Sequence, residues 1–195
     1  MPRRFMRRNA HGIALLVLTA ALVGCSDDDK SGEFYTQWDL AGGCVGDDGA
    51  TLRHDADGRA HDVCAVGEGR WVWVTYAAGW CEASRAQAPA VNRLRRTAPE
   101  GLEVFVVLTS GDEIFTVAER GDARAWAASY RFPRNRVLFD DELHSRVVPQ
   151  HLLIGPDGRT WYRYVGFLQL EAMQQLFDDF ASGTRLPDVR QLALR

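Results

Sequence analysis

Lysine is almost absent from this chain. Lys30 is the only lysine among 195 residues, and the basic side chains, 23 in all, are nearly all arginine, against 26 acidic ones. Four arginines lie within the first ten residues; without that leader, 19 basic side chains face 26 acidic ones, a net charge of −7. A surface of that sign repels nucleic-acid phosphates, which argues against nucleic-acid binding.

The chain also lacks internal repeats and any apolar run long enough to span a bilayer comfortably. Its longest apolar stretch is Ile13 to Val23, whereas a membrane-spanning helix needs about 20 apolar residues. Hydrophobic residues make up 46% of the chain and charged residues 25%. This composition predicts one globular domain rather than a disordered or polytopic membrane protein.

The amino terminus has the layout of an export signal. An arginine-rich start leads through the apolar stretch into "LVGC", which resembles the lipobox of bacterial lipoproteins. The resemblance implies that residues 1–24 are removed, that Cys25 carries the lipid, and that residues 25–33 form a polar tether. It places the protein in the bacterial cell envelope, facing the periplasm, and Ser26 after the lipidated residue favours the outer membrane. The alternative is an ordinary signal peptide followed by a free cysteine.

Three cysteines remain in the exported part of the chain, an odd number in a compartment that favours disulfides. A disulfide between Cys44 and Cys64 would close a loop of about 20 residues and add about 3 kcal/mol of stability. That pairing leaves Cys81 as a lone thiol. An alternative has His54 and His61 bind a metal with Cys44 and Cys64, although the spacing matches no established ligand pattern; otherwise both histidines are expected in solvated loops.

Hydrophobic periodicity predicts the order β-α-β-α-β-β-α from residue 71, an α/β fold with a mixed sheet flanked by helices. The predicted elements are a buried strand at 71–76, a helix at 82–97 kinked by Pro89, a strand at 102–108, a helix at 121–130, a hairpin of 150–154 and 159–165, and an amphipathic helix from Leu170 to Phe180. The segment 137–139 is too short to assign. A turn-rich extension at 34–67 precedes the domain at 68–182, and 183–195 form a tail.

Two sequence landmarks resemble the TlpA-like periplasmic thiol-disulfide oxidoreductases, which have a thioredoxin-like fold. That family carries Trp-Cys-x-x-Cys followed by Arg-x-Glu-x-Pro in the first helix, and "WCEASRAQAP" matches it at four positions: Trp80, Cys81, Arg85 and Pro89. The second landmark, "VVPQHLLIGPDG", looks like the family's cis-proline strand and hairpin. The resemblance implies that Pro149 is a cis-proline opposite the Cys81 turn.

This chain departs from the family where the chemistry is done. Ser84 replaces the second cysteine and Gln87 replaces the acidic residue of the helix. The resemblance then implies a monothiol site, with Cys81 attacking at a helix amino terminus that lowers a thiol pKa from about 8.5 toward 7. The Ser84 hydroxyl is expected to hydrogen-bond to that sulfur, and Pro149 completes the catalytic set. The expected substrate-binding residues are Trp80, Val148 and Gln87.

The predicted function is thiol-disulfide exchange on periplasmic protein thiols or disulfides, with a glutathione-like small thiol as a further partner and without a cofactor. In the monothiol mechanism Cys81 must be unpaired in the resting protein; in a variant, Cys44 or Cys64 resolves it. One alternative is a non-catalytic thioredoxin-like binding module. Another is a metal-handling lipoprotein that uses Cys81 with His144 or His151. A peroxiredoxin is disfavoured, because Ala78 stands where that family has threonine.

Overall fold

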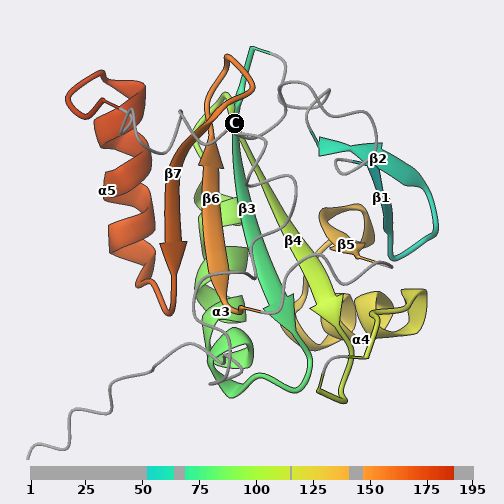
Figure 1. Cartoon of the computed structure of the whole chain (residues 1–195). Helices are drawn as coiled ribbons and strands as arrows, with labels where there is room; N and C mark the ends of the chain where they lie inside the picture. Colours follow the sequence, from blue (N-terminus) through green and yellow to red (C-terminus); the bar gives the residue numbers. More distant parts are fainter. Residues whose placement is uncertain (1–51, 64–68, 115, 141–146, 187–195) are drawn as a thin grey trace, which may run out of the picture.

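A mixed β-sheet with helices forms the core of the computed structural model, which describes residues 52–63, 69–114, 116–140 and 147–186 (Figure 1). Within these residues seven strands follow the order β2-β1-β5-β4-β3-β6-β7. The strands are β1 (Leu52–Asp55), β2 (Ala60–Asp62), β3 (Trp71–Ala78), β4 (Leu102–Ser110), β5 (Val137–Phe139), β6 (Gln150–Ile154) and β7 (Thr160–Val165). The helices are α3 (Glu82–Thr97), α4 (Arg120–Tyr130) and α5 (Leu170–Ala181), with a 3-10 turn η1 (Arg134–Arg136).

β3 is the strand on which the rest of the sheet is arranged. Its first six residues, WVWVTY, are all aromatic or β-branched, as suits a strand covered on both faces. It pairs in parallel with β4 and antiparallel with β6. The predicted order of elements is confirmed, including the β6–β7 hairpin. β5, which the sequence left unassigned, is a further strand that pairs in parallel with β4.

Alternation along β3 divides the core into two clusters, because successive side chains point to opposite faces of the sheet. Trp73 belongs to the cluster that packs against all three helices, through residues such as Val91 of α3, Trp126 of α4 and Phe177 of α5. α3 has the predicted bounds and runs through Pro89 without a break. None of the described helices is both long and apolar enough to cross a bilayer.

The opposite face of β3 carries the second cluster. Val72, Val74 and Tyr76 lie in it together with Cys81 and Val148. Every one of these side chains is buried. The end of β3 therefore leads directly into the position of Cys81.

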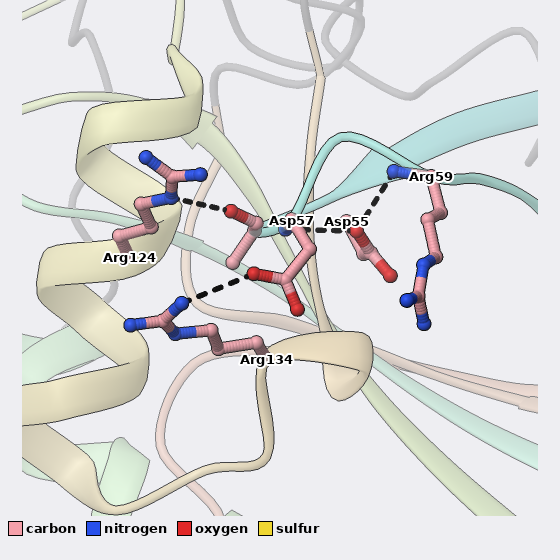
Figure 2. Close-up of polar contacts among 6 residues, drawn as sticks. Asp55, Asp57, Arg59, Arg124 and Arg134 are labelled. Atoms are coloured by element: carbon pink, nitrogen blue, oxygen red, sulfur yellow. Dashed lines mark hydrogen bonds and ion pairs between the residues drawn. The ribbon is translucent and has the colours of Figure 1, made fainter.

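The β1–β2 hairpin was not predicted, since it falls in the turn-rich extension. Its turn is fixed by the carboxylate of Asp55, whose Oδ1 accepts hydrogen bonds from the backbone N–H groups of Asp57 (2.8 Å) and Arg59 (2.9 Å). Figure 2 shows how two arginines from outside the hairpin hold it. Arg124 of α4 donates to the Ala56 carbonyl (2.8 Å), and Arg134 of η1 forms an ion pair with Asp57 (3.1 Å). β1 also pairs with β5, so the hairpin extends the same sheet.

The two histidines of this region lie on strands, so the expectation that they are solvated loop residues was wrong. His61 Nε2 is 2.6 Å from Asp55 Oδ2, and the His54 ring stacks on Phe139 with centroids 6.0 Å apart. Burial raises the pKa of Asp55, but the hydrogen bonds from Arg59, His61 and Asp57 outweigh it and hold that pKa below its usual value. The other proposed metal ligands, Cys44 and Cys64, lie outside the described residues. Among those that are described, no group of three or more potential ligand residues is placed to hold a metal ion.

Candidate functional site

The Cys81 turn is built by tight contacts between the ends of β3 and β4. The backbone N–H of Gly79 donates to the carbonyl of Ser110 (3.2 Å), and that of Trp80 donates to the carbonyl of Gly111 (3.1 Å). A Cβ on Gly79 would lie 2.6 Å from Asp112 Oδ1 and 2.8 Å from the Gly111 carbonyl oxygen. Only glycine fits this approach, which sets the point at which the chain leaves the sheet.

Cys81 is the N-cap residue of α3, as the sequence predicted. The backbone N–H of Ser84 donates to its sulfur (3.4 Å). N–H groups of a first helical turn have no partners within the helix, so they and the helix dipole favour negative charge at this position. The turn is therefore suited to stabilise a thiolate when the sulfur is reduced.

Ser84 acts differently from the expectation. Its hydroxyl is fully buried and forms no hydrogen bond within the described residues; only its backbone N–H reaches the sulfur. The predicted hydroxyl–sulfur hydrogen bond is therefore wrong. Ser84 occupies the position of a second cysteine without contributing its oxygen.

Pro149 lies where the resemblance placed it. The Val148–Pro149 peptide bond is cis, and the Val148 carbonyl oxygen is 3.6 Å from the Cys81 sulfur. The Val148 side chain is completely buried, so this residue presents its backbone to the sulfur. Trp80 is partly exposed and packs against the same cluster, at the rim of the turn. The structure therefore places Pro149, Val148 and Trp80 around the Cys81 turn.

Cys81 is disulfide-bonded, which contradicts the prediction of a lone thiol. Its sulfur is buried in this oxidised state, with the residue 0% exposed. The partner is one of Cys25, Cys44 and Cys64, all of which lie outside the described residues. If Cys44 and Cys64 paired with each other, Cys25 would be the remaining partner for Cys81. The predicted Cys44–Cys64 disulfide and the predicted lipid on the Cys25 sulfur therefore cannot both hold. A resting monothiol mechanism does not fit this arrangement.

Gln87 is a structural residue, not the predicted substrate-binding one. It is 1% exposed, and its side-chain amide makes two hydrogen bonds to the backbone of Leu168. Oε1 accepts from the Leu168 N–H (2.7 Å), while Nε2 donates to the Leu168 carbonyl (2.8 Å). Gln87 thereby fastens the Cys81 helix to the segment between β7 and α5.

A buried polar network on the helix-covered side of the sheet was missed by the sequence reasoning. Trp73 Nε1 donates to Thr75 Oγ1 (3.2 Å), and this hydroxyl is 3.0 Å from His151 Nδ1. The Thr75 hydroxyl therefore links the Trp73 indole to the His151 imidazole inside the core. Burial lowers the pKa of His151 to about 3, against a small raising effect of the Gly166 backbone. The sequence did contain a signal: Thr75 is the one hydroxyl-bearing aliphatic residue in the run WVWVTY, and His151 directly precedes the apolar run of β6.

This placement also separates His151 from Cys81. His151 contacts Trp73 of the helix-side cluster, with ring centroids 5.7 Å apart, whereas Cys81 belongs to the cluster on the other face. A metal site that joins these two residues is therefore wrong. The other proposed ligand, His144, lies outside the described residues.

Comparison with solved structures identifies the fold. The chain is similar to the exposed lipoprotein thioredoxin of Streptococcus pneumoniae, with a TM-score of 0.52 and 18% identity over 66% of this chain and 97% of that one. It is similar to a thiol:disulfide interchange protein of the thioredoxin family from Chlorobium tepidum (TM-score 0.54, 15% identity, 65% and 90% covered). A secreted disulfide oxidoreductase of Mycobacterium tuberculosis gives a TM-score of 0.51 at 16% identity, covering 67% and 94%.

Searches by sequence give no further assignment. No protein-family model matches the chain, and no curated protein matches it. At these identities the structural likeness establishes the fold alone. The chain has a thioredoxin-like fold, and its neighbours in that fold are thiol-disulfide oxidoreductases.

Proposed function

We propose that the protein performs thiol-disulfide exchange in the bacterial cell envelope, with Cys81 as the attacking sulfur and an upstream cysteine as the second sulfur. One observation carries the proposal: a disulfide-bonded Cys81 caps α3 beside cis-Pro149. A sulfur that forms a disulfide at a helix amino terminus is the arrangement that exchange chemistry needs. The protein with the Cys81 disulfide is then the oxidised state of the exchange cycle, and the protein with two free thiols is its reduced state.

The second sulfur must come from outside the turn, because Ser84 cannot form a disulfide. Cys44 and Cys64 are the candidates, since Cys25 is expected to carry a lipid. Val63, the residue before Cys64, is buried in the same cluster as Cys81 and Val148. The chain therefore passes close to the turn at this point, which favours Cys64.

The exchange step balances without a cofactor. The Cys81 thiolate attacks a substrate disulfide, forms a mixed disulfide and releases one substrate sulfur as thiolate. The upstream thiolate then attacks Cys81 in the mixed disulfide, which releases the second substrate thiol and leaves the protein disulfide. Two electrons and two protons pass to the substrate, and the reverse sequence oxidises a dithiol.

The envelope location rests on the leader sequence and on Cys25 as the lipid-bearing residue. Periplasmic proteins with thiols or disulfides are the proposed partners, and a small thiol such as glutathione is a further reductant. Export also supports the chemistry, because an oxidising compartment maintains the Cys81 disulfide. Mass spectrometry of the mature protein from cells would detect a lipidated Cys25 amino terminus; an unmodified one would contradict the anchor.

Turnover of an insulin disulfide with excess glutathione tests the reaction. We expect Cys81→Ser to abolish turnover, Cys64→Ala to accumulate a mixed disulfide on Cys81, and Cys44→Ala to behave like the wild type. Peptide mapping of the oxidised protein identifies the partner of Cys81 independently. Equal rates for the wild type and Cys81→Ser would refute exchange through this sulfur.

A non-catalytic binding module is the second candidate, because Cys81 is fully buried in its oxidised state. In that case the disulfide only stabilises the fold, and removing it costs about 2–5 kcal/mol without a loss of activity. Equilibration with glutathione buffers separates the two functions. A structural disulfide has a reduction potential below about −300 mV, whereas an exchanging one is more easily reduced.

A further inference from the structure

A small pocket opens beside the Cys81 turn, between the amino-terminal end of α3, the segment after β4, and α4. Its volume is about 190 Å³. That is below the range of about 300–1,000 Å³ typical of sites for drug-sized ligands. The side chains and backbone that matter for its chemistry come from Gly79, Arg85, Asp112, Trp126, Ser129 and Tyr130. The pocket is the right size for a molecule as small as an amino acid.

Three charged side chains line this pocket, Arg85, Asp112 and Asp122, and among the described residues Arg85 forms an ion pair with neither carboxylate. Arg85 uses one Nη1 proton to donate to the Gly79 carbonyl (2.6 Å), and within the described residues its other N–H groups have no partner. The Asp112 carboxylate lies beside the same glycine and accepts no hydrogen bond from any described residue. No ion pair within 4.0 Å joins Arg85 to Asp112. Both groups therefore keep their capacity to bind a ligand.

A second carboxylate of the pocket, that of Asp122, already takes part in a helix cap. Asp122 Oδ2 accepts a hydrogen bond from the Glu119 backbone (2.8 Å) as part of the capping box that begins α4. Asp112 is therefore the carboxylate of this pocket that accepts no hydrogen bond from a described residue. It lies on the segment after β4, directly against Gly79, where a Cβ on that glycine would be 2.6 Å from Asp112 Oδ1.

The opposite wall is aromatic and hydroxylic. The Trp126 and Tyr130 rings contact each other, with centroids 4.5 Å apart, and Ser129 adds a hydroxyl without a partner in the described part of the chain. Burial raises the pKa of Tyr130, and the positive charge of Arg85 acts against this effect. Arg85 and Tyr130 both line the pocket.

We propose that this pocket binds the α-amino-acid group of a small molecule, with its carboxylate on Arg85 and its ammonium on Asp112. A simple anion would face the unpaired Asp112 carboxylate, and a simple cation would face the Arg85 guanidinium. A zwitterion satisfies both, because its two charges are only a few atoms apart. Given thiol-disulfide exchange as the proposed function, the ligand class is sulfur-containing amino acids such as cysteine and cystine; that choice of class rests on the proposed function.

Calorimetric titration of the oxidised protein with S-methyl-L-cysteine tests this site, because the probe has both charges but cannot exchange disulfides. N-acetyl-S-methyl-L-cysteine lacks the ammonium, and S-methyl-L-cysteine amide lacks the carboxylate. We expect each to bind at least about tenfold more weakly than the parent, the loss expected for one charge-assisted hydrogen bond. Arg85→Gln and Asp112→Asn should weaken the parent similarly, whereas the matched surface changes Arg93→Gln and Asp178→Asn should not.

Absence of binding, equal binding of the three probes, or unchanged binding by the Arg85 and Asp112 variants would each overturn the proposal. The probe series uses wild-type protein, so it does not depend on how well a variant folds. Loss of exchange activity in Cys81→Ser, with probe binding intact, would support the exchange function and the pocket together. Binding in a protein that shows no exchange would leave the pocket standing and refute only the exchange function.

Discussion

Replacement of Gln87 by glutamate tests how the Cys81 helix is held to the rest of the fold. The neutral amide is the right group for this position, because it accepts from the Leu168 N–H (2.7 Å) and donates to the Leu168 carbonyl (2.8 Å) at once. An ionised glutamate keeps the first hydrogen bond but places a carboxylate oxygen against the carbonyl oxygen. A protonated glutamate can make both.

The size of the expected destabilisation follows from the free-energy cost of keeping the introduced glutamate protonated. Protonating a glutamate with an ordinary pKa of about 4.3 at pH 7 costs about 4 kcal/mol, which is an upper limit for the destabilisation by Gln87→Glu. Leaving the Leu168 carbonyl unsatisfied costs about 1–3 kcal/mol before the buried charge is counted. We therefore expect a loss of about 2–4 kcal/mol at pH 7 in the free energy of unfolding.

The pH dependence gives the sharper measurement. The folded state raises the pKa of the introduced glutamate, so the variant is nearest to the wild type below pH 4.3 and its deficit grows as the pH rises through the folded pKa. Urea unfolding of the oxidised proteins at pH 4.5 and pH 7 measures this difference. Gln174→Glu is a partly exposed control and should change stability by less than about 0.5 kcal/mol. A Gln87→Glu variant as stable as the wild type at pH 7, or a deficit that does not shrink at pH 4.5, would refute the reasoning.

Three further outcomes are expected. Gly79→Ala should destabilise the protein by about 1–3 kcal/mol in thermal unfolding, because its Cβ would meet the Gly111 backbone at 2.8 and 3.0 Å, besides the Asp112 carboxylate at 2.6 Å. An added Cβ at Gly121 meets nothing, so Gly121→Ala should not destabilise the protein; equal melting temperatures for the two variants would contradict the close approach. Burial lowers the pKa of His151 from 6.5 to about 3, so the stability present above pH 6.5 should fall as the pH drops toward 3. The urea midpoint of His151→Gln should depend less on pH than that of the wild type over this range. Asp55→Ala removes a buried carboxylate that accepts three hydrogen bonds, so it should lower the free energy of unfolding in urea by more than about 2 kcal/mol. Asp57→Ala loses only an exposed ion pair and should lower it by less than about 1 kcal/mol. The reverse order would contradict the hairpin geometry.

Local patterns were sufficient for the elements that surround Cys81. The run "WVWVTY" predicted β3 because every residue of it suits a strand buried on both faces, and the structure extends that strand to Ala78. The turn "GPDG" between two apolar runs predicted the β6–β7 hairpin. Cys81 and Pro149 were placed together by resemblance rather than by pattern, and the distance from the Val148 carbonyl to the sulfur agrees with that placement.

The β1–β2 hairpin could not be predicted in the same way, because tertiary contacts stabilise it. Its strands are four and three residues long and largely polar, so they give no clear alternation. Arg124 and Arg134, which fix its turn, lie some 70 residues further along the chain, beyond the reach of any local pattern. The role of Gln87 was missed for the same reason, since both of its hydrogen-bond partners belong to Leu168.

The departures from the dithiol family act together on how a proton leaves Cys81. Gln87 is neutral at every pH and is fully engaged by Leu168, and His151, with a pKa of about 3, is too weak a base to take a thiol proton at neutral pH. Neither group can replace the acidic residue that the family carries in the helix. With neither of these described residues able to act as the base, we expect the reduced sulfur to lose its proton to solvent or to the substrate, and the Ser84 N–H with the dipole of α3 stabilises the resulting thiolate. The alkylation rate of reduced Cys81 should accordingly follow a single ionisation and should not change when His151 is replaced by glutamine.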